Sequence, residues 1–159
     1  MTHEEIFIAI ALKEWKSTID RTSNFLLPLT DDGLQKQVAP GKNRLVYLWA
    51  HLIAVHDLMI PLLRLGDRLH PELDEQFLAN PDDLNHPVPG ASALKSYWDS
   101  VNAVLLPGME RFTPSEWLER HNSVSPDDFS KNPLRNRLAI LISRTNHLST
   151  HLGQLLLAK

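Results

Sequence analysis

One stretch near the carboxyl end, Asn146 to Gln154, reads NHLSTHLGQ. Its leucines continue an apolar pattern of helical spacing that begins at Leu134, and this pattern predicts a helix that starts at Asn132-Pro133 and runs to the end of the chain. On such a helix His147 and His151 are four residues apart, so their imidazoles project from one flank of the apolar stripe. The stretch therefore predicts a long helix that offers two ligands to one small object, such as a metal ion.

Three further segments have helical periodicity, and no segment alternates as a strand would. We expect a helix from about His3 to Leu27, begun by a capping box at Thr2 and Glu5, and a second from Arg44 to Leu65, capped by Asn43 and bent at Pro61. A third should run from a cap at Ser92 to Pro107-Gly108, which should kink or break it. Short helical turns are expected around Glu72 to Leu78 and after a capping box at Thr113, with loop from His121 to Lys131. Four long helices predict an all-α four-helix bundle, and the long link from Asp67 to Gly90 permits a crossover between helices two and three.

Length and composition narrow the class of protein. A chain of 159 residues without a break in composition suits one domain, residues 1–159. The net charge of -3 is dispersed, which argues against a nucleic-acid partner. No apolar run approaches the roughly 20 residues that cross a bilayer, and the amino end lacks the order of a signal peptide. We therefore expect a cytoplasmic protein with no membrane partner. Because there is no cysteine, a metal must be held by nitrogen and oxygen ligands.

The second predicted helix contains two histidines, and only one of them suits a site. With about 100° per residue and His51 at zero, His56 lies about 140° away. The apolar residues within about 60° of His51 are Leu48, Val55, Leu58 and Leu62. We therefore predict that His51 faces the core and His56 faces outward. A lone histidine on an apolar stripe is more often a hydrogen-bonded core residue than a ligand, so His51 needs partners.

Those partners are the two histidines of the last helix, if the two helices are antiparallel. His51 lies eight residues after Asn43, and His151 lies eight residues before the carboxyl end, so each is about 12 Å from a helix end. Antiparallel neighbours would bring all three histidines to one level. A parallel pair with aligned starts would separate His51 from His147 by about 10 Å along the helix axis, too far for shared coordination.

Three neutral imidazoles around a divalent ion leave at least one coordination position for water or substrate. The retained charge of the ion favours an anion there: hydroxide, carboxylate or the thiolate of a small molecule. Zinc, nickel and iron all accept imidazole ligands, so the spacing leaves the choice of metal open.

The residues around these histidines resemble a known family. The run from His147 to Leu155, HLSTHLGQL, is similar to the last-helix motif of the DinB/YfiT-like superfamily, and Trp49-Ala50-His51-Leu52, preceded by Pro40-Gly41-Lys42, resembles its second-helix histidine region. The resemblance covers nearly the whole chain. It implies a bundle of up-down-down-up order, often dimeric, with a divalent metal bound by His51, His147 and His151. Leu152 departs from the arginine that related motifs often have after the second histidine.

The resemblance also implies a class of reaction. Activities in the superfamily include metal-dependent transfer of low-molecular-weight thiols, such as bacillithiol or mycothiol, and the isomerisation of maleylpyruvate. Our first hypothesis is therefore an enzyme that transfers such a thiol to an electrophilic small-molecule substrate. Arg144 and Tyr47, each about one turn before a histidine, are candidates to orient an anionic substrate or donate a proton, although a core-packed arginine and an interface tyrosine would also explain them. The alternatives are a metal-dependent hydrolase and a non-catalytic, stress-associated bundle that binds a metal or ligand. We expect a homodimer in each case.

Overall fold

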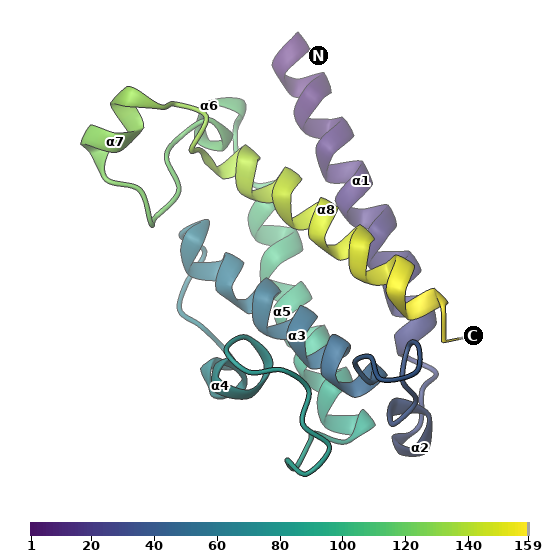
Figure 1. The fold of residues 1–159 in the computed structure, drawn as a ribbon. Coiled ribbons are helices and arrows are strands. Elements are labelled where there is room, and N and C mark those ends of the chain that lie inside the picture. The colour runs from purple at the N-terminus through teal and green to yellow at the C-terminus, as the bar shows by residue number, and fades with distance from the viewer. Residues whose placement is uncertain (159) are drawn as a thin grey trace.

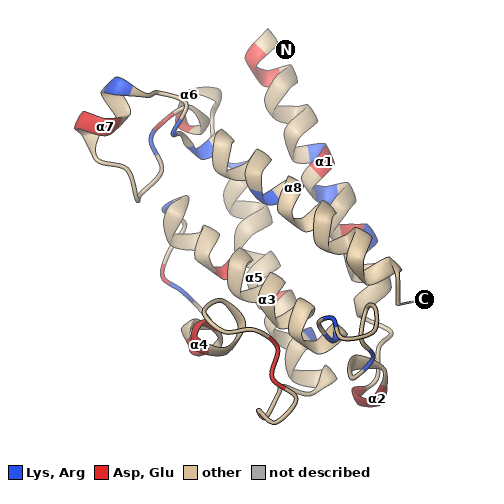
Figure 2. Cartoon of the chain, in the orientation of Figure 1, with Lys and Arg blue, Asp and Glu red and all other residues tan. Residues whose placement is uncertain are grey.

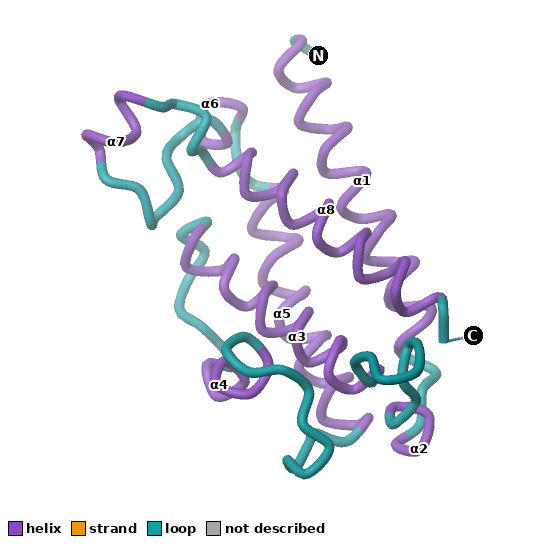
Figure 3. The backbone as a smooth tube through the Cα atoms, viewed as in Figure 1, coloured by secondary structure: helices purple, strands orange, loops and turns teal. Residues whose placement is uncertain are grey.

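The structure is a computed structural model that describes residues 1–158, and its helices carry almost all of its regular structure (Figures 1 and 3). Four helices are long: α1 (His3–Leu26), α3 (Leu45–Leu62), α5 (Ala91–Glu110) and α8 (Arg137–Leu156). The short ones are α2 (Asp31–Leu34), the 3-10 turn η1 (Pro71–Leu73), α4 (Asp74–Phe77), α6 (Pro114–Trp117) and α7 (Pro126–Lys131). Extended pairing within residues 1–158 is confined to two isolated bridges, Gln37 with Arg44 and Arg120 with Asn136. The all-α prediction is confirmed.

Two helices begin at the capping boxes that the sequence predicts. At α1, Thr2 accepts a hydrogen bond from the Glu5 backbone N–H, and the Glu5 carboxylate accepts one from the Thr2 N–H. At α6, Thr113 and Glu116 pair in the same way, with Pro114 at the first helical position.

Helix α3 is the central helix of the bundle. Thirteen of its 18 residues are buried, and Asp57 is its single charged residue. Nearly all of its ribbon has the colour of uncharged residues (Figure 2). The expectation that no apolar run approaches the length of a membrane span was wrong, because Leu45–Leu62 could cross a membrane by length and composition. However, 78% of that 18-residue window is buried by the rest of the chain, as in the core helix of a soluble protein.

The burial of α3 on several sides explains why the prediction for His56 was wrong. His56 is fully buried, with its ring 4.9 Å from the ring centroid of Trp15 on α1 and 5.3 Å from that of Trp98 on α5. The face of α3 opposite His51 therefore meets two further helices and not solvent.

Both ends of α3 and both ends of α5 differ from the prediction. Arg44, and not Asn43, is the cap of α3, and its side chain forms no capping hydrogen bond. Helix α3 ends at Leu62 and not at Leu65, one residue after Pro61, and Arg64 then takes a left-handed φ of 60°. Helix α5 begins without help from Ser92, because Asp31 of α2 accepts a hydrogen bond from the Ala91 N–H at 2.6 Å. It also continues through Pro107 to Glu110, since Pro107 and Ala103, whose carbonyl loses its donor, are both exposed to water.

The start of α8 was also predicted wrongly. Asn132 ends α7, a helix within the segment predicted as loop, and Asn136 caps α8 by accepting a hydrogen bond from the Ala139 N–H at 2.9 Å. Asn132 instead accepts one from the Leu134 N–H, and Leu134 is 76% exposed. Both asparagines have the chemistry of a cap, and α8 begins where Arg137 N–H can also donate to the Glu119 carbonyl.

Helices α3 and α8 are antiparallel neighbours (Figure 1). This is the arrangement that the prediction from the sequence required to bring the three histidines to the same height along the helix axes. The last turn of α8 is tied to the segment before α3, because Lys36 Nζ donates to the Ala158 carbonyl and the Lys36 carbonyl accepts from the Leu45 N–H. At the other end, Asn122 N–H donates to the Leu62 carbonyl, close in sequence to the Glu119 that contacts the start of α8.

Candidate metal centre

Three histidine side chains meet at the seam between α3 and α8. His51 Nε2 lies 3.2 Å from His147 Nε2, and His151 Nε2 lies 3.1 Å from the same atom. All three rings are half-buried, and one nitrogen of each lies within 4.8 Å of the others. The structure thus brings together the three residues that the sequence singles out, and it leaves His56 in the core behind them.

The outer nitrogens of two of these rings fix which nitrogen has the proton. His51 Nδ1 is 2.7 Å from the Phe77 carbonyl oxygen, which can only accept, so Nδ1 is the donor and Nε2 of the neutral ring has a lone pair. His151 Nδ1 is 2.7 Å from Gln154 Oε1, and the same reasoning leaves its Nε2 with a lone pair. Two acceptor nitrogens therefore point at His147.

A divalent cation fits this arrangement better than hydrogen bonds among the histidines do. His147 Nε2 has at most one hydrogen, so it can satisfy only one of the two lone pairs that face it. Nitrogen ligands at 2.0 to 2.1 Å around a tetrahedral ion are about 3.3 to 3.4 Å apart. The two pairs that include His147 Nε2 are close to this, at 3.1 and 3.2 Å, and the third pair lies within 4.8 Å. The three histidines form a site that can bind a divalent metal.

Burial favours the neutral form that metal ligation requires. Burial, with the nearby His151, His51 and Arg144, lowers the pKa of His147 to about 4. Burial also lowers the pKa of His151, partly offset by its hydrogen bond to Gln154. At neutral pH both imidazoles are ready to ligate without losing a proton first.

The Phe77 carbonyl reaches His51 because buried ion pairs hold the crossover between α3 and α5 against α3. Asp57, fully buried on α3, accepts hydrogen bonds from Arg68 Nε at 2.7 Å and from the Leu69 and His70 backbone N–H groups. Arg68 in turn donates to both carboxylate oxygens of Asp74, the first residue of α4, which ends at Phe77.

A second pair fixes the far side of the same crossover. Arg44 is 5% exposed and donates to Asp82 through both its backbone N–H and its guanidinium, with the closest ion-pair distance 2.7 Å. This hydrogen-bonded pairing raises the pKa of Arg44. The crossover is thus anchored at both ends of the segment that contacts His51.

The two other candidate residues, Tyr47 and Arg144, lie near the triad and differ in whether their polar groups have partners. Tyr47 stacks parallel to His51, with an interplanar angle of 9° and ring centroids 6.2 Å apart, and its hydroxyl donates to the Asn80 carbonyl at 2.7 Å. Burial raises the pKa of Tyr47. Arg144 is half-buried, forms no ion pair with the described residues, and its buried Nε has no hydrogen-bond partner among them. Burial lowers the pKa of Arg144.

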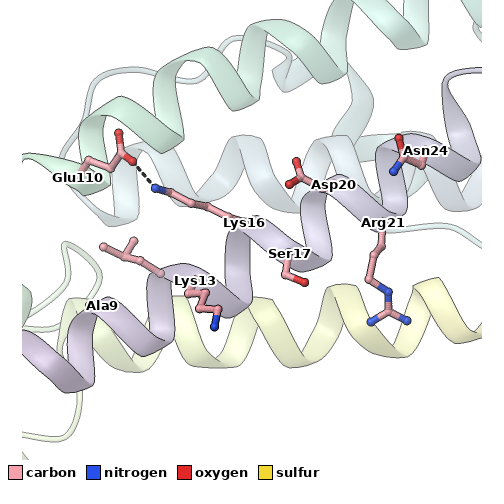
Figure 4. A pocket seen from close by; sticks show the side chains of 9 residues that line it. Ala9, Lys13, Lys16, Ser17, Asp20, Arg21, Asn24 and Glu110 are labelled. Atoms are coloured by element: carbon pink, nitrogen blue, oxygen red, sulfur yellow. Dashed lines mark hydrogen bonds and ion pairs between the residues drawn. The ribbon is translucent and has the colours of Figure 1, made fainter.

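A groove elsewhere on the molecule has no histidine in its lining. It has a volume of about 630 Å³, lies along α1 and reaches Glu110 of α5 (Figure 4). Its charged side chains have both signs, and Lys16 is paired with Glu110. The groove contains no set of metal ligands, whereas the three histidines of the triad form one.

Two contacts of the triad were missed from the sequence. Gln154 lies three residues after His151, on the same side of a helix, so its contact was readable from spacing. The contact of His51 with the Phe77 carbonyl could not be predicted, because a backbone group 26 residues away has no sequence signature.

Comparison with known proteins identifies the family of this chain. A search of curated proteins finds no match. A family model described as the DinB superfamily matches residues 14–155, a span that contains all three histidines and the four long helices except for the first turns of α1 and the last residue of α8. The chain therefore belongs to the DinB superfamily.

Proposed function

We propose that this protein is a metal-dependent enzyme that transfers a low-molecular-weight thiol to an electrophilic small-molecule substrate. The observation that supports it is the convergence of three Nε2 atoms, two of which have lone pairs fixed by hydrogen bonds at Nδ1. His51, His147 and His151 would hold a divalent zinc, nickel or iron ion, which supplies positive charge that lowers the pKa of a bound thiol and leaves one position open. The chain has no cysteine, so the nucleophile would come from solution.

Arg144 and Tyr47 are the chain's own residues proposed to act beside the ion. The Arg144 guanidinium lacks an acidic partner among the described residues, and it is placed one turn before His147. A half-buried cation without a counter-ion leaves its charge available to a ligand, so we assign it to an anionic group of the substrate. Tyr47 keeps its proton at neutral pH and would line the site with its ring while its hydroxyl holds the Asn80 carbonyl.

The first test is metal content after purification without a histidine tag, in the wild type and in His51→Ala and His147→Ala variants. We expect about one equivalent of divalent metal in the wild type and a loss of at least tenfold in affinity in each variant. Wild-type protein that binds no metal would rule out the enzyme.

The second test screens thiol cofactors with electrophilic substrates on the metal-loaded protein. Turnover that requires both metal and thiol supports the transferase. Turnover with water alone would favour a metal-dependent hydrolase, and metal binding without turnover would favour a non-catalytic, stress-associated bundle.

We also propose that the protein is a cytoplasmic homodimer in up-down-down-up bundle order. The outer faces of α1 and α8 expose apolar side chains on both sides of a groove of about 360 Å³, with Phe7 68%, Ile10 54% and Ile142 48% exposed. Patches of this kind on soluble proteins are usually covered by a partner. Sedimentation should give a dimer for the wild type and a monomer for Phe7→Glu, and a wild-type monomer would contradict the proposal.

A further inference from the structure

A groove lies beyond His151 at the carboxyl end of α8, and the function proposed above does not use it. It has a volume of about 310 Å³, within the range of small-molecule sites. Its lining combines apolar Val38, Ala39 and Leu157 with polar Lys42, Asn43 and Gln154. Leu157 is 69% exposed, so an apolar surface is available there to a ligand.

One lining residue connects this groove to the metal centre. Gln154 lines the groove and also accepts the His151 Nδ1 hydrogen bond at 2.7 Å. The groove therefore begins one hydrogen bond away from a proposed metal ligand. It lies beyond His151 along α8, whereas Arg144 lies before His147, so the two flank the triad along the helix axis.

The opposite wall is a turn whose geometry is fixed. Lys42 N–H donates to the Ala39 carbonyl at 3.0 Å, Pro40 occupies the second position of the turn, and Gly41 has a φ of 70°. These are the features of a type II turn, in which proline and glycine are the favoured central residues. The Val38 N–H to Asn43 carbonyl bond closes the turn further, so Lys42 is presented at the rim of the groove on an ordered backbone.

The positive charge of Lys42 determines which class of ligand the groove would bind. Lys42 is its only charged lining residue, it forms no ion pair with the described residues, and its partners in the lining are amides and aliphatic groups. An ammonium above an apolar floor suits a short aliphatic chain that ends in a carboxylate.

We infer that this groove is a binding subsite for the anionic end of the small molecule that occupies the triad, with Lys42 as the residue that selects a carboxylate. The inference rests on the proposed function, because it assumes that a ligand reaches the triad. It gives the Pro40-Gly41-Lys42 turn a direct role in recognition.

The test uses the zinc-loaded full chain and two series of probes: mercaptocarboxylates with two to six carbons, and the neutral amides of the same lengths. Calorimetric titration should show at least one chain length at which the carboxylate binds about threefold to tenfold more tightly than its amide, with a preference that weakens as salt rises. Lys42→Met should abolish that preference without changing zinc affinity. Lys131→Met, on exposed α7, is the matched control and should preserve it.

The outcomes separate the subsite from the metal centre. If zinc does not bind, the proposed function fails before the groove is tested. If zinc and both probe series bind but carboxylates and amides are equal at every length, or if Lys42→Met leaves the preference intact, the subsite is overturned while the metal centre stands. Backbone amide shifts at Asn43 and Leu157 on adding the preferred carboxylate provide a readout independent of activity, and shifts confined to residues outside the groove would also overturn it.

Discussion

His56 is the residue from which we expect the largest pH dependence of stability. It is fully buried between Trp15 and Trp98, neither ring nitrogen has a partner among the described residues, and burial lowers its pKa to about 3. The unfolded chain binds a proton at His56 as the pH falls below about 6.5, whereas the folded chain does not until about 3. The free energy of unfolding therefore decreases through this window, by about 2 kcal/mol at pH 5 from this residue alone.

His56→Leu should remove that part of the pH dependence, as measured by urea unfolding of metal-free protein at pH 7.5 and pH 5. We expect the loss of stability between these values to be about 2 kcal/mol smaller in the variant. His86→Leu, at an exposed loop position, should keep the wild-type loss. Identical pH dependence in wild type and His56→Leu would contradict the assignment.

Gln154 is expected to tune metal affinity through His151. Gln154→Ala removes the acceptor that fixes the ring, and the affinity for zinc should fall about tenfold. Gln154→Glu keeps an acceptor and makes it anionic, so its affinity should equal or exceed that of the wild type. Competition with a chelator measures both, with Gln76→Ala of α4 as the glutamine control. Equal affinity in all four proteins would show that the contact does not orient the ligand.

For single residues, the sequence predicts the direction of a side chain around its own helix. The i, i+4 spacing of His147 and His151 and the inward direction of His51 follow from helical angles alone. The same angles gave a wrong prediction for His56, because they describe a single helix. They contain no information about α1 and α5, which pack against the far side of α3.

At the scale of elements, one buried carboxylate, Asp57, holds the first part of the crossover between α3 and α5. Asp57→Ala leaves Arg68 and two backbone N–H groups without their acceptor, and should lower the free energy of unfolding by about 3 kcal/mol. Asp74, the other partner of Arg68, has a side chain that is 39% exposed, so Asp74→Ala should cost under about 1 kcal/mol.

Hydrogen exchange distinguishes a loosened crossover from general destabilisation. In Asp57→Ala we expect faster exchange across η1 and α4, and weaker zinc binding because the Phe77 carbonyl no longer fixes His51. Uniformly faster exchange over all four long helices would contradict a local role for Asp57.

Element boundaries depend on partners that the sequence does not reveal. The capping boxes at Thr2 and Thr113 are local, and both predictions were confirmed. The start of α8 depends on the Glu119 carbonyl, and the start of α5 depends on Asp31, 60 residues away. Where two candidate caps have the same chemistry, as Asn132 and Asn136 do, only the tertiary contact decides between them.

At the scale of the whole molecule, the core and the metal centre are separable. The largest buried side chains, among them Trp15, Trp49 and Trp98, pack in the interior of the bundle, whereas the triad lies half-buried at one seam. A fold whose core is complete without the ion should survive metal removal, unlike a small structural zinc domain. Chelation should therefore leave the helical circular dichroism spectrum unchanged at 25 °C.

Thermal unfolding should still report the ion, because it binds only the folded chain. At a free zinc concentration of about 100 times Kd the stabilisation is about 2.7 kcal/mol, or about 5 to 10 °C in Tm for a chain of this size. His51→Ala should lose this shift and His86→Ala should retain it. Loss of helix on chelation would mean that the ion is part of the fold, and an unchanged Tm in the wild type would mean that the triad does not hold it. A folded apo protein with a metal-dependent Tm is the result expected when the ion binds a bundle that folds without it.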